Sequence, residues 1–175
     1  LSILINVKHY KQPAMEDLKL FEQRKKDHIR LTLDSKTQNL TPHDFSRIKL
    51  VPNALPELNF SEVNLETKLL DQKLSSPHFI SSMTAGHKQG FEINSLLAEA
   101  AGIKNWLFCV GSQKRSLINP KEVSDIQQIA KQYKKTKLVS NIGLEEVIGF
   151  KPSDILRLAD SINAVGLIIH ANALQ

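Results

Sequence analysis

The sequence predicts an α/β fold built on a parallel sheet, and three observations support this prediction. Four short apolar runs follow one another at intervals of about thirty residues, the length of one strand and helix unit. Each gap between two runs contains apolar residues at helical spacing. The runs are almost continuously apolar, as strands are when both faces of a parallel sheet are covered. They are HFIS at 78–81, WLFCV at 106–110, LVSNI at 138–142 and GLIIH at 166–170.

The first 75 residues lack this regularity, and we expect them to form an irregular extension with a little antiparallel structure. Residues 18–33 are predicted to be a short helix or arm with a cationic face. The segment 45–51 is predicted to be extended, and alternation of apolar and polar residues over 63–69 predicts a half-buried strand. The predicted division is an N-terminal extension and arm over 1–75 and one domain over 76–175.

Three helices are predicted between the strands, each from one apolar stripe. We expect the middle helix to follow Asn119 as N-cap, with Pro120 in its first position and Glu122 completing a capping box. The stripes are Ile93, Leu96, Leu97, Ala100 and Ala101; Val123, Ile126, Ile129 and Tyr133; and Ile155, Leu158, Ala159 and Ile162.

This alternation of strands and helices fits two architectures, a doubly wound open sheet and part of a (β/α)8 barrel. The turn after the first run, MTAGHKQG at 83–90, lacks the GxGxxG spacing of dinucleotide-binding open sheets. We therefore expect a TIM-type (β/α)8 barrel of which only about the first four strands are present, preceded by the irregular extension.

Composition and motifs exclude several classes of function. A chain of 175 residues with 41% hydrophobic content is long enough for one domain with a core. The net charge of +5 favours anionic partners, but the basic clusters contain no interleaved aromatic residues, so we expect no nucleic-acid partner. The spacing of Cys and His matches no zinc site, and no metal ligands are predicted in this chain. The GxSxG and Walker motifs are also missing.

The single cysteine, Cys109, lies in an apolar run and is predicted to be buried and inert. One cysteine allows no internal disulfide, which fits a reducing compartment. No apolar run reaches the roughly 18 residues that a membrane span needs. We therefore expect a cytoplasmic protein without a membrane partner.

Small and polar residues follow every predicted strand, at the edge where α/β folds bind ligands. A purely structural explanation also exists, because strand ends lead into surface loops. Four such sets on one rim nevertheless predict a site for a flat, hydrogen-bonding heterocycle rather than for a metal. The sets are Ser81, Ser82 and Thr84; Gly111, Ser112 and Gln113; Asn141 and Gly143; and His170, Asn172 and Gln175.

Six ordered motifs resemble those of one family: FEQRKKDHIRL, SSPHFISSMTAG, GFEINSLLAEAAG, VGSQ followed by NP, SNIG, and IIHANALQ. Together they resemble the N-terminal half of type 2 isopentenyl-diphosphate isomerases, from Phe21 to Gln175. The resemblance implies a (β/α)8 barrel that binds reduced FMN, uses Mg²⁺ and takes NAD(P)H as reductant. It implies an isomerase of isoprenoid biosynthesis that interconverts isopentenyl and dimethylallyl diphosphate without net redox change.

The resemblance also implies roles for single residues. Met83, Thr84, Ala85, Ser112 and Asn141 match FMN contacts. Substrate contacts are implied at Arg24, Lys25, His28, Lys114, His170, Asn172 and Gln175.

Chemistry fits these implied roles. Guanidinium and ammonium groups suit a diphosphate, and a small residue such as Ala85 lets the backbone approach the flavin. Gln175 is the implied catalytic residue, facing the substrate carbons. Because a neutral amide is a poor acid or base, we assign it a positioning or relay role. The reduced flavin would exchange the protons.

Some residues depart from the family pattern. Lys114 and Arg115 follow GSQ, which leaves open which of them contacts the diphosphate, and HANALQ carries Ala171 and Ala173 in place of bulkier residues. The family continues past Gln175 with a magnesium-binding glutamate and four more strand and helix units. We expect the truncated chain to bind FMN weakly or not at all and to be inactive. We also expect Met15 to be the initiator, with residues 1–14 an artefact.

Two alternatives remain open. One is another FMN-binding barrel oxidoreductase, although the RKKDH arm favours a diphosphate substrate. The other is an inactive half-barrel fragment that acts only by assembling with a second chain. For the full-length enzyme we expect a small-molecule diphosphate substrate and a homo-oligomer.

Overall fold

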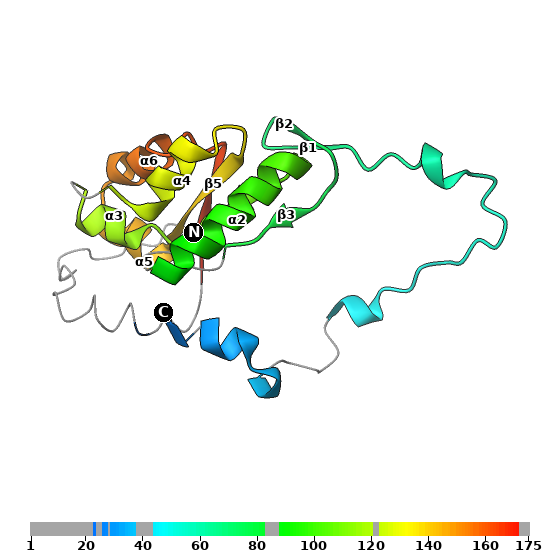
Figure 1. Cartoon of the computed structure of the whole chain (residues 1–175), viewed down its shortest axis with the longest axis horizontal. Helices are drawn as coiled ribbons and strands as arrows, with labels where there is room; N and C mark the ends of the chain where they lie inside the picture. The colour runs from blue at the N-terminus through cyan, green and yellow to red at the C-terminus, as the bar shows by residue number, and fades with distance from the viewer. Residues whose placement is uncertain are drawn as a thin grey trace, which may run out of the picture.

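The computed structural model describes residues 23, 26–27, 29–37, 44–82, 88–120 and 123–171. Its centre is a sheet of four parallel strands in the order β3-β4-β5-β6 (Figure 1). The four predicted strands are therefore confirmed, in sequence order. They are β3 (Phe79–Ile80), β4 (Leu107–Cys109), β5 (Lys137–Gly143) and β6 (Gly166–His170).

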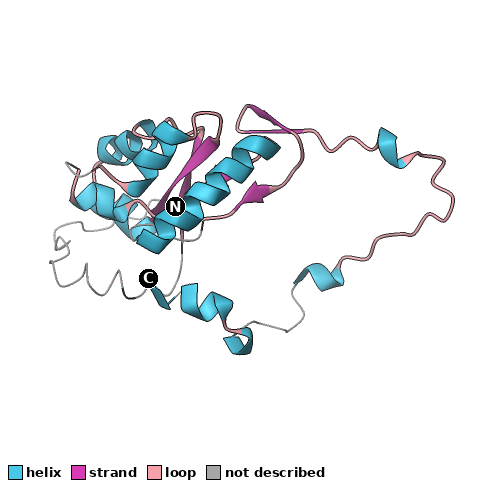
Figure 2. Ribbon diagram, in the orientation of Figure 1, coloured by secondary structure: helices cyan, strands magenta, loops and turns pink. Residues whose placement is uncertain are grey.

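The helices gather on one side of this sheet (Figure 2). Phe108 of β4 packs with Ala98 and Ile129, which lie on two different helices. Further along the same face, Ile142 of β5 packs with Ile155. The helices are α2 (Lys88–Lys104), α3 (Lys114–Ile118), α4 (Asp125–Gln132), α5 (Leu144–Gly149) and α6 (Pro152–Asp160). In the described part of the chain, no helix has the length and apolarity to cross a membrane.

A hairpin of β1 (Thr67–Leu69) and β2 (Gln72–Leu74) packs on the opposite face of the sheet. Leu74 is buried there against Leu107, Cys109 and Val139. These strand residues alternate with those that face the helices, so the sheet has two separate packing layers. Burial of Cys109 is confirmed, and it raises the pKa of the thiol.

Polar contacts fasten the hairpin to the amino ends of the strands. The ammonium group of Lys137, the first residue of β5, donates to the carbonyl oxygen of Lys73 at 2.5 Å and to Oδ1 of Asn105 at 2.6 Å. The Asn105 amide donates to the same Lys73 carbonyl at 3.3 Å. The hairpin thus closes the amino end of the sheet and leaves the carboxyl ends of the strands on the other side.

The strand order separates the two architectures that the sequence leaves open. A doubly wound sheet reverses its strand order and carries helices on both faces. Among the described elements the order is sequential and the longer helices cover one face. An α/β fold with a parallel sheet is confirmed, and this arrangement is consistent with part of a (β/α)8 barrel.

The segment before the hairpin differs from its prediction. The 45–51 stretch is not wholly extended, because the 3-10 helix Asp44–Arg47 occupies its start. The predicted strand over 63–69 forms only from Thr67 onward. The reason is local: the side chain of Asn64 accepts a hydrogen bond from the backbone N–H of Glu66 at 2.8 Å, and this turn competes with strand pairing.

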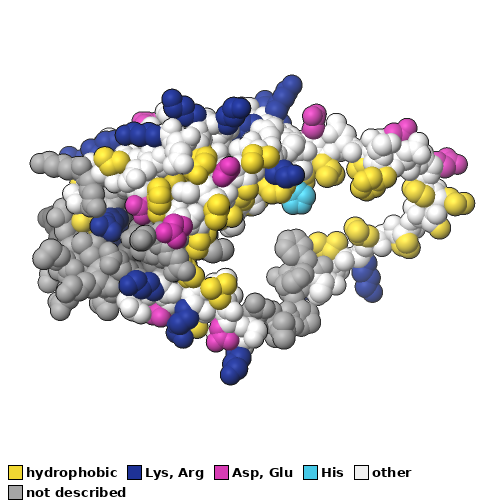
Figure 3. Space-filling view, viewed as in Figure 1, with side chains coloured by type: hydrophobic (Ala, Val, Ile, Leu, Met, Phe, Trp, Pro, Cys, Tyr) yellow, Lys and Arg dark blue, Asp and Glu magenta, His cyan; other side chains and the backbone are white. Residues whose placement is uncertain are grey.

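The same segment runs away from the sheet as a long excursion (Figure 1). Several of its apolar side chains are exposed, among them Leu50, Val51, Leu55 and Phe60. Figure 3 shows such side chains along the excursion. They contribute nothing to the core around the sheet.

Two helix predictions also need correction. The cap of α4 is Ser124, whose hydroxyl accepts from the backbone N–H of Gln127 at 3.3 Å, and not Asn119. Asn119 instead ends α3, a helix too short to show a stripe. On α2 the buried face includes Asn94 and Ala98, while Leu96 of the predicted stripe is exposed.

Candidate functional site at the carboxyl ends of the strands

Asn141 and His170 lie on the same face of the sheet. Asn141 pairs in register with Ile168, and Gly143 with His170. Registered partners in a parallel sheet point to the same side, and Ile168 packs with the layer opposite the helices. Asn141 is buried and His170 is exposed at the end of β6. The two side chains therefore occupy successive levels of one face, toward the carboxyl ends.

Asn141 carries an unsatisfied oxygen. Its Oδ1 is buried and has no hydrogen-bond partner among the described residues. An unpaired buried acceptor costs about 1–3 kcal/mol, so such groups are retained where a ligand or a water uses them. The atom can accept a hydrogen bond from an N–H group of a ligand.

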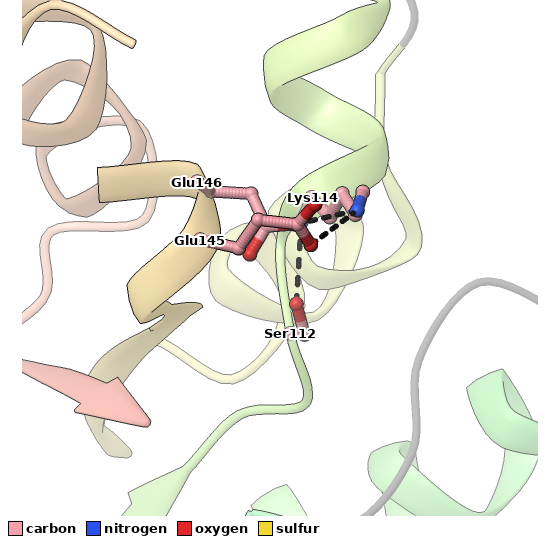
Figure 4. A network of polar contacts seen from close by, with 4 residues as sticks. All are labelled: Ser112, Lys114, Glu145 and Glu146. Carbon is pink, nitrogen blue, oxygen red and sulfur yellow. Dashed lines mark hydrogen bonds and ion pairs between the residues drawn. The ribbon is translucent and has the colours of Figure 1, made fainter. Parts of the chain in front are cut away.

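Ser112 lies next to this position. The backbone N–H of its neighbour Gln113 donates to the Asn141 carbonyl at 3.0 Å, which ties the loop after β4 to β5. The Ser112 hydroxyl accepts from the backbone N–H of Lys114 at 3.5 Å (Figure 4). Ser112 is half-buried, and Asn141 is buried. The Ser112 hydroxyl lies in the loop after β4, and the Asn141 amide lies on the strand to which that loop is tied.

Lys114 connects this loop to the helix that follows β5. Its ammonium nitrogen lies 2.6 Å from Oε1 of Glu146 and 3.5 Å from Oε2 of Glu145 (Figure 4). Glu146 is buried and Glu145 is exposed. A Cβ atom on Gly143 would collide with the Glu146 carboxylate, so the glycine leaves room for it. The sequence did not single out Glu146, and the nearest signal was the EE pair at 145–146, which follows SNIG after Leu144.

The structure brings together three of the predicted site residues, Ser112, Lys114 and Asn141, and puts His170 on the Asn141 face. The other residues for which a cofactor or substrate contact was implied lie outside the described residues. These are Arg24, Lys25, His28, Met83, Thr84, Ala85, Asn172 and Gln175. Within the described ranges, no three His, Cys, Asp or Glu side chains are grouped as metal ligands.

Comparison with known proteins gives consistent relatives. An isopentenyl-diphosphate delta-isomerase of Bdellovibrio bacteriovorus is 43% identical over 159 residues, covering 89% of this chain and 46% of that protein. The protein of the same name from Legionella pneumophila is 39% identical over 155 residues, covering 89% of this chain and 45% of its own length. That of Oceanobacillus iheyensis is 34% identical over 155 residues, covering 87% of this chain and 44% of its own length.

The chain thus spans less than half the length of these curated relatives. Their shared name confirms the resemblance that the motifs predict. A family model described as FMN-dependent dehydrogenase matches residues 29–140, well over half of the chain. On this match, the chain belongs to the FMN-dependent dehydrogenase family.

Proposed function

We propose that this chain is the N-terminal half of an FMN-dependent isomerase that interconverts isopentenyl and dimethylallyl diphosphate. The observation that carries the proposal is the buried, unpartnered oxygen of Asn141, found in a chain whose relatives are named isopentenyl-diphosphate delta-isomerases. Residues 76–175 would supply the first four strand and helix units of a (β/α)8 barrel. Sequential strands with helices on one face support that assignment.

The described residues fit a flat heterocycle better than a metal ion. Asn141 offers an acceptor to a ring N–H, and the Ser112 hydroxyl can donate or accept. Met83, Thr84 and Ala85 complete the proposed FMN contacts. When bound in its reduced form, FMN would supply an electron-rich ring that exchanges protons with the substrate. NAD(P)H as reductant and Mg²⁺ with the diphosphate belong to the same proposal.

Cations are needed for the diphosphate, and Lys114 is the one proposed contact of this kind that the structure describes. An ammonium group has three N–H donors. A phosphate oxygen would replace the longer contact to exposed Glu145, while the 2.6 Å contact to buried Glu146 is kept. Arg24, Lys25 and His28 would supply the remaining positive charge.

The reacting carbons would lie between the flavin and Gln175. Because a neutral amide neither gives nor takes a proton readily, Gln175 would orient the substrate or relay a proton. His170, on the same sheet face as Asn141, and Asn172 would hold the substrate close to the end of β6.

Replacement of Asn141 tests the cofactor site. In the product of the complete reading frame that encodes these residues, Asn141→Leu should weaken FMN binding about tenfold or more, measured by flavin fluorescence titration. The urea midpoint of the apoprotein should not fall, because the substitution removes a buried acceptor without a partner. Asn53→Ala, at an exposed asparagine, should change neither value. Wild-type FMN affinity in the Leu variant would contradict the proposed contact.

The name of the matching family favours a second candidate, a redox enzyme. The two candidates differ in stoichiometry. With FMN, NADPH and Mg²⁺, an isomerase should form dimethylallyl diphosphate from isopentenyl diphosphate in large excess over the NADPH consumed. A dehydrogenase or oxidase should consume one reductant or oxidant for each product molecule, and that result would replace the isomerase proposal.

A further inference from the structure

We infer that Gln113 is a positioning residue: it locks the loop that carries Ser112 and Lys114 onto β5 and thereby sets the spacing of the FMN contacts. The inference rests on the proposed function. Gln113 was predicted to lie at the rim of the ligand site, but the family resemblance implies no contact for it, and its role follows from the bonds that it makes.

Gln113 is bonded to two consecutive residues of β5. Its backbone N–H donates to the carbonyl of Asn141 at 3.0 Å. Its side-chain Oε1 accepts from the hydroxyl of Ser140 at 2.5 Å. Two bonds to adjacent residues of one strand fix both the position and the rotation of the loop relative to that strand.

The same residue begins helix α3. The carbonyl of Gln113 accepts from the backbone N–H of Ser116 at 2.9 Å. Lys114 is therefore the first residue of a helix whose start is held to β5. Any shift of Gln113 would move Ser112 on one side and Lys114 on the other.

The side chain of Gln113 bonds to β5 on the sheet face opposite the proposed flavin site. Leu138 and Ile142 both pack with helices, so Ser140, which alternates in phase with them, lies on the helix-covered face. Asn141 points to the other face. Ser140 is completely buried, and it cannot contact a ligand beside Asn141. Its hydrogen bond to Gln113 gives it a route to such a ligand in addition to the backbone of β5.

The burial of Gln113 supports this role. The residue is 3% exposed, and its Nε2 has no hydrogen-bond partner in the described part of the chain. Burying an amide with idle N–H groups is unfavourable, and an apolar side chain of equal size would avoid that cost. What glutamine offers here is the hydrogen bond from Ser140, which an apolar side chain could not accept.

Ser140→Ala is the decisive variant, made in the product of the complete reading frame. We expect the FMN dissociation constant to rise roughly fivefold, the range expected from loss of one hydrogen bond. In the apoprotein, the amide protons of Gln113 and Ser116 should exchange with solvent faster than in the wild type. The exchange measurement needs no flavin. A wild-type protein that fails to bind FMN would thus refute the proposed function while the locking of the loop is still tested.

Two further variants separate positioning from general destabilisation. Thr136→Val removes a hydrogen bond of 2.7 Å to the Ala98 carbonyl, at the opposite end of β5. It should lower stability to a similar extent and leave FMN affinity unchanged. Gln113→Leu combined with Ser140→Ala should bind FMN no more weakly than Gln113→Leu alone, because both changes break one bond. Unchanged FMN affinity in Ser140→Ala, or additive losses in the double variant, would overturn the inference.

Discussion

Lys114 shows how one charged residue can link two elements at the rim of the sheet. It belongs to α3, and its ammonium nitrogen lies 2.6 Å from the carboxylate of Glu146 in α5. The Lys114 side chain is 24% exposed and that of Glu146 only 6%, so the pair is shielded from water on one side. Exposed pairs contribute up to about 1 kcal/mol, whereas breaking a buried pair costs about 3–5 kcal/mol.

Lys114→Met should therefore destabilise the protein by an amount between these limits, on the order of 2 kcal/mol. The methionine retains most of the apolar stem but leaves the Glu146 carboxylate without its cation. Urea unfolding measures the effect. Glu145→Gln, at the exposed carboxylate, should change stability by less than about 0.5 kcal/mol. Equal losses of stability in the two variants would show that the buried Lys114–Glu146 contact contributes no more than an exposed ion pair.

Cys109 gives the protein a pH dependence in the alkaline range. Burial raises the pKa of its thiol above the ordinary value of 9.0. Above that pH the unfolded chain loses the thiol proton while the folded chain keeps it. The stabilising contribution is therefore fully present below pH 9.0 and is lost as the pH rises toward the folded pKa.

Unfolding measured between pH 8 and 10 should show a smaller decline for Cys109→Ala than for the wild type, because the alanine cannot ionise. Every other side chain is the same in the two proteins, so the difference between the curves isolates position 109. A thiol reagent should label native Cys109 only at the rate of unfolding. Parallel stability curves for the two proteins would contradict the assignment.

The helices between the strands differ in how firmly the sequence determines their ends. Helix α4 has a complete capping box, in which the backbone N–H of Ser124 also donates to the Gln127 side chain at 2.9 Å. Helix α6 begins with Pro152 after Lys151 and has no side-chain cap. A cap decides where a helix starts even when the apolar stripe would allow it to start earlier.

Ser124→Ala should lower the free energy of unfolding by about 1 kcal/mol, because the first backbone N–H groups of α4 lose their acceptor. Ser153→Ala is the matched control, an exposed serine inside the first turn of α6 that caps nothing. It should have little effect or stabilise slightly, since alanine favours helix. Thermal unfolding of the two variants side by side gives the comparison, and a larger loss at Ser153 would argue against the observed cap.

Periodicity located the elements better than their ends or their faces. The strands were predictable because short apolar runs bounded by polar residues have few other structures available. The face of α2 was not, since Asn94 is buried and Leu96 exposed, against the usual preference of both. In the site, Asn141 and Ser112 were identifiable as polar residues at strand ends. Glu146 was not, because an acidic residue is ordinarily exposed and only the folded chain shows its partner.

At the scale of the whole molecule, the hairpin and the helices enclose the sheet from its two faces. Leu74 is 2% exposed and is the hairpin's buried contact with β4 and β5. The N-terminal extension is therefore partly integrated with the sheet that follows it. The proposed boundary between residues 75 and 76 divides the chain in sequence, but close packing crosses it.

Leu74→Ala should destabilise the whole sheet by about 3 kcal/mol, since it opens a cavity between the hairpin and the strands. Leu69→Ala, in the same hairpin at an exposed position, should cost less than about 0.5 kcal/mol. Tryptophan fluorescence of Trp106, which packs in the helix-side layer, should report the loss as a shift of the global transition. Loss confined to the hairpin, with the Trp106 transition unchanged, would mean that the hairpin unfolds separately.

The sequential order of the strands also has a consequence in time. Each strand from β4 to β6 pairs with the one synthesised just before it, so a new unit can dock as soon as it leaves the ribosome. The hairpin contacts Asn105 and β4 first, and the contact of Lys137 with Lys73, which joins residues 64 positions apart, is added when β5 emerges. We therefore expect nascent chains to gain protease resistance in steps, with the hairpin partly protected once β4 has emerged and fully protected once β5 has followed.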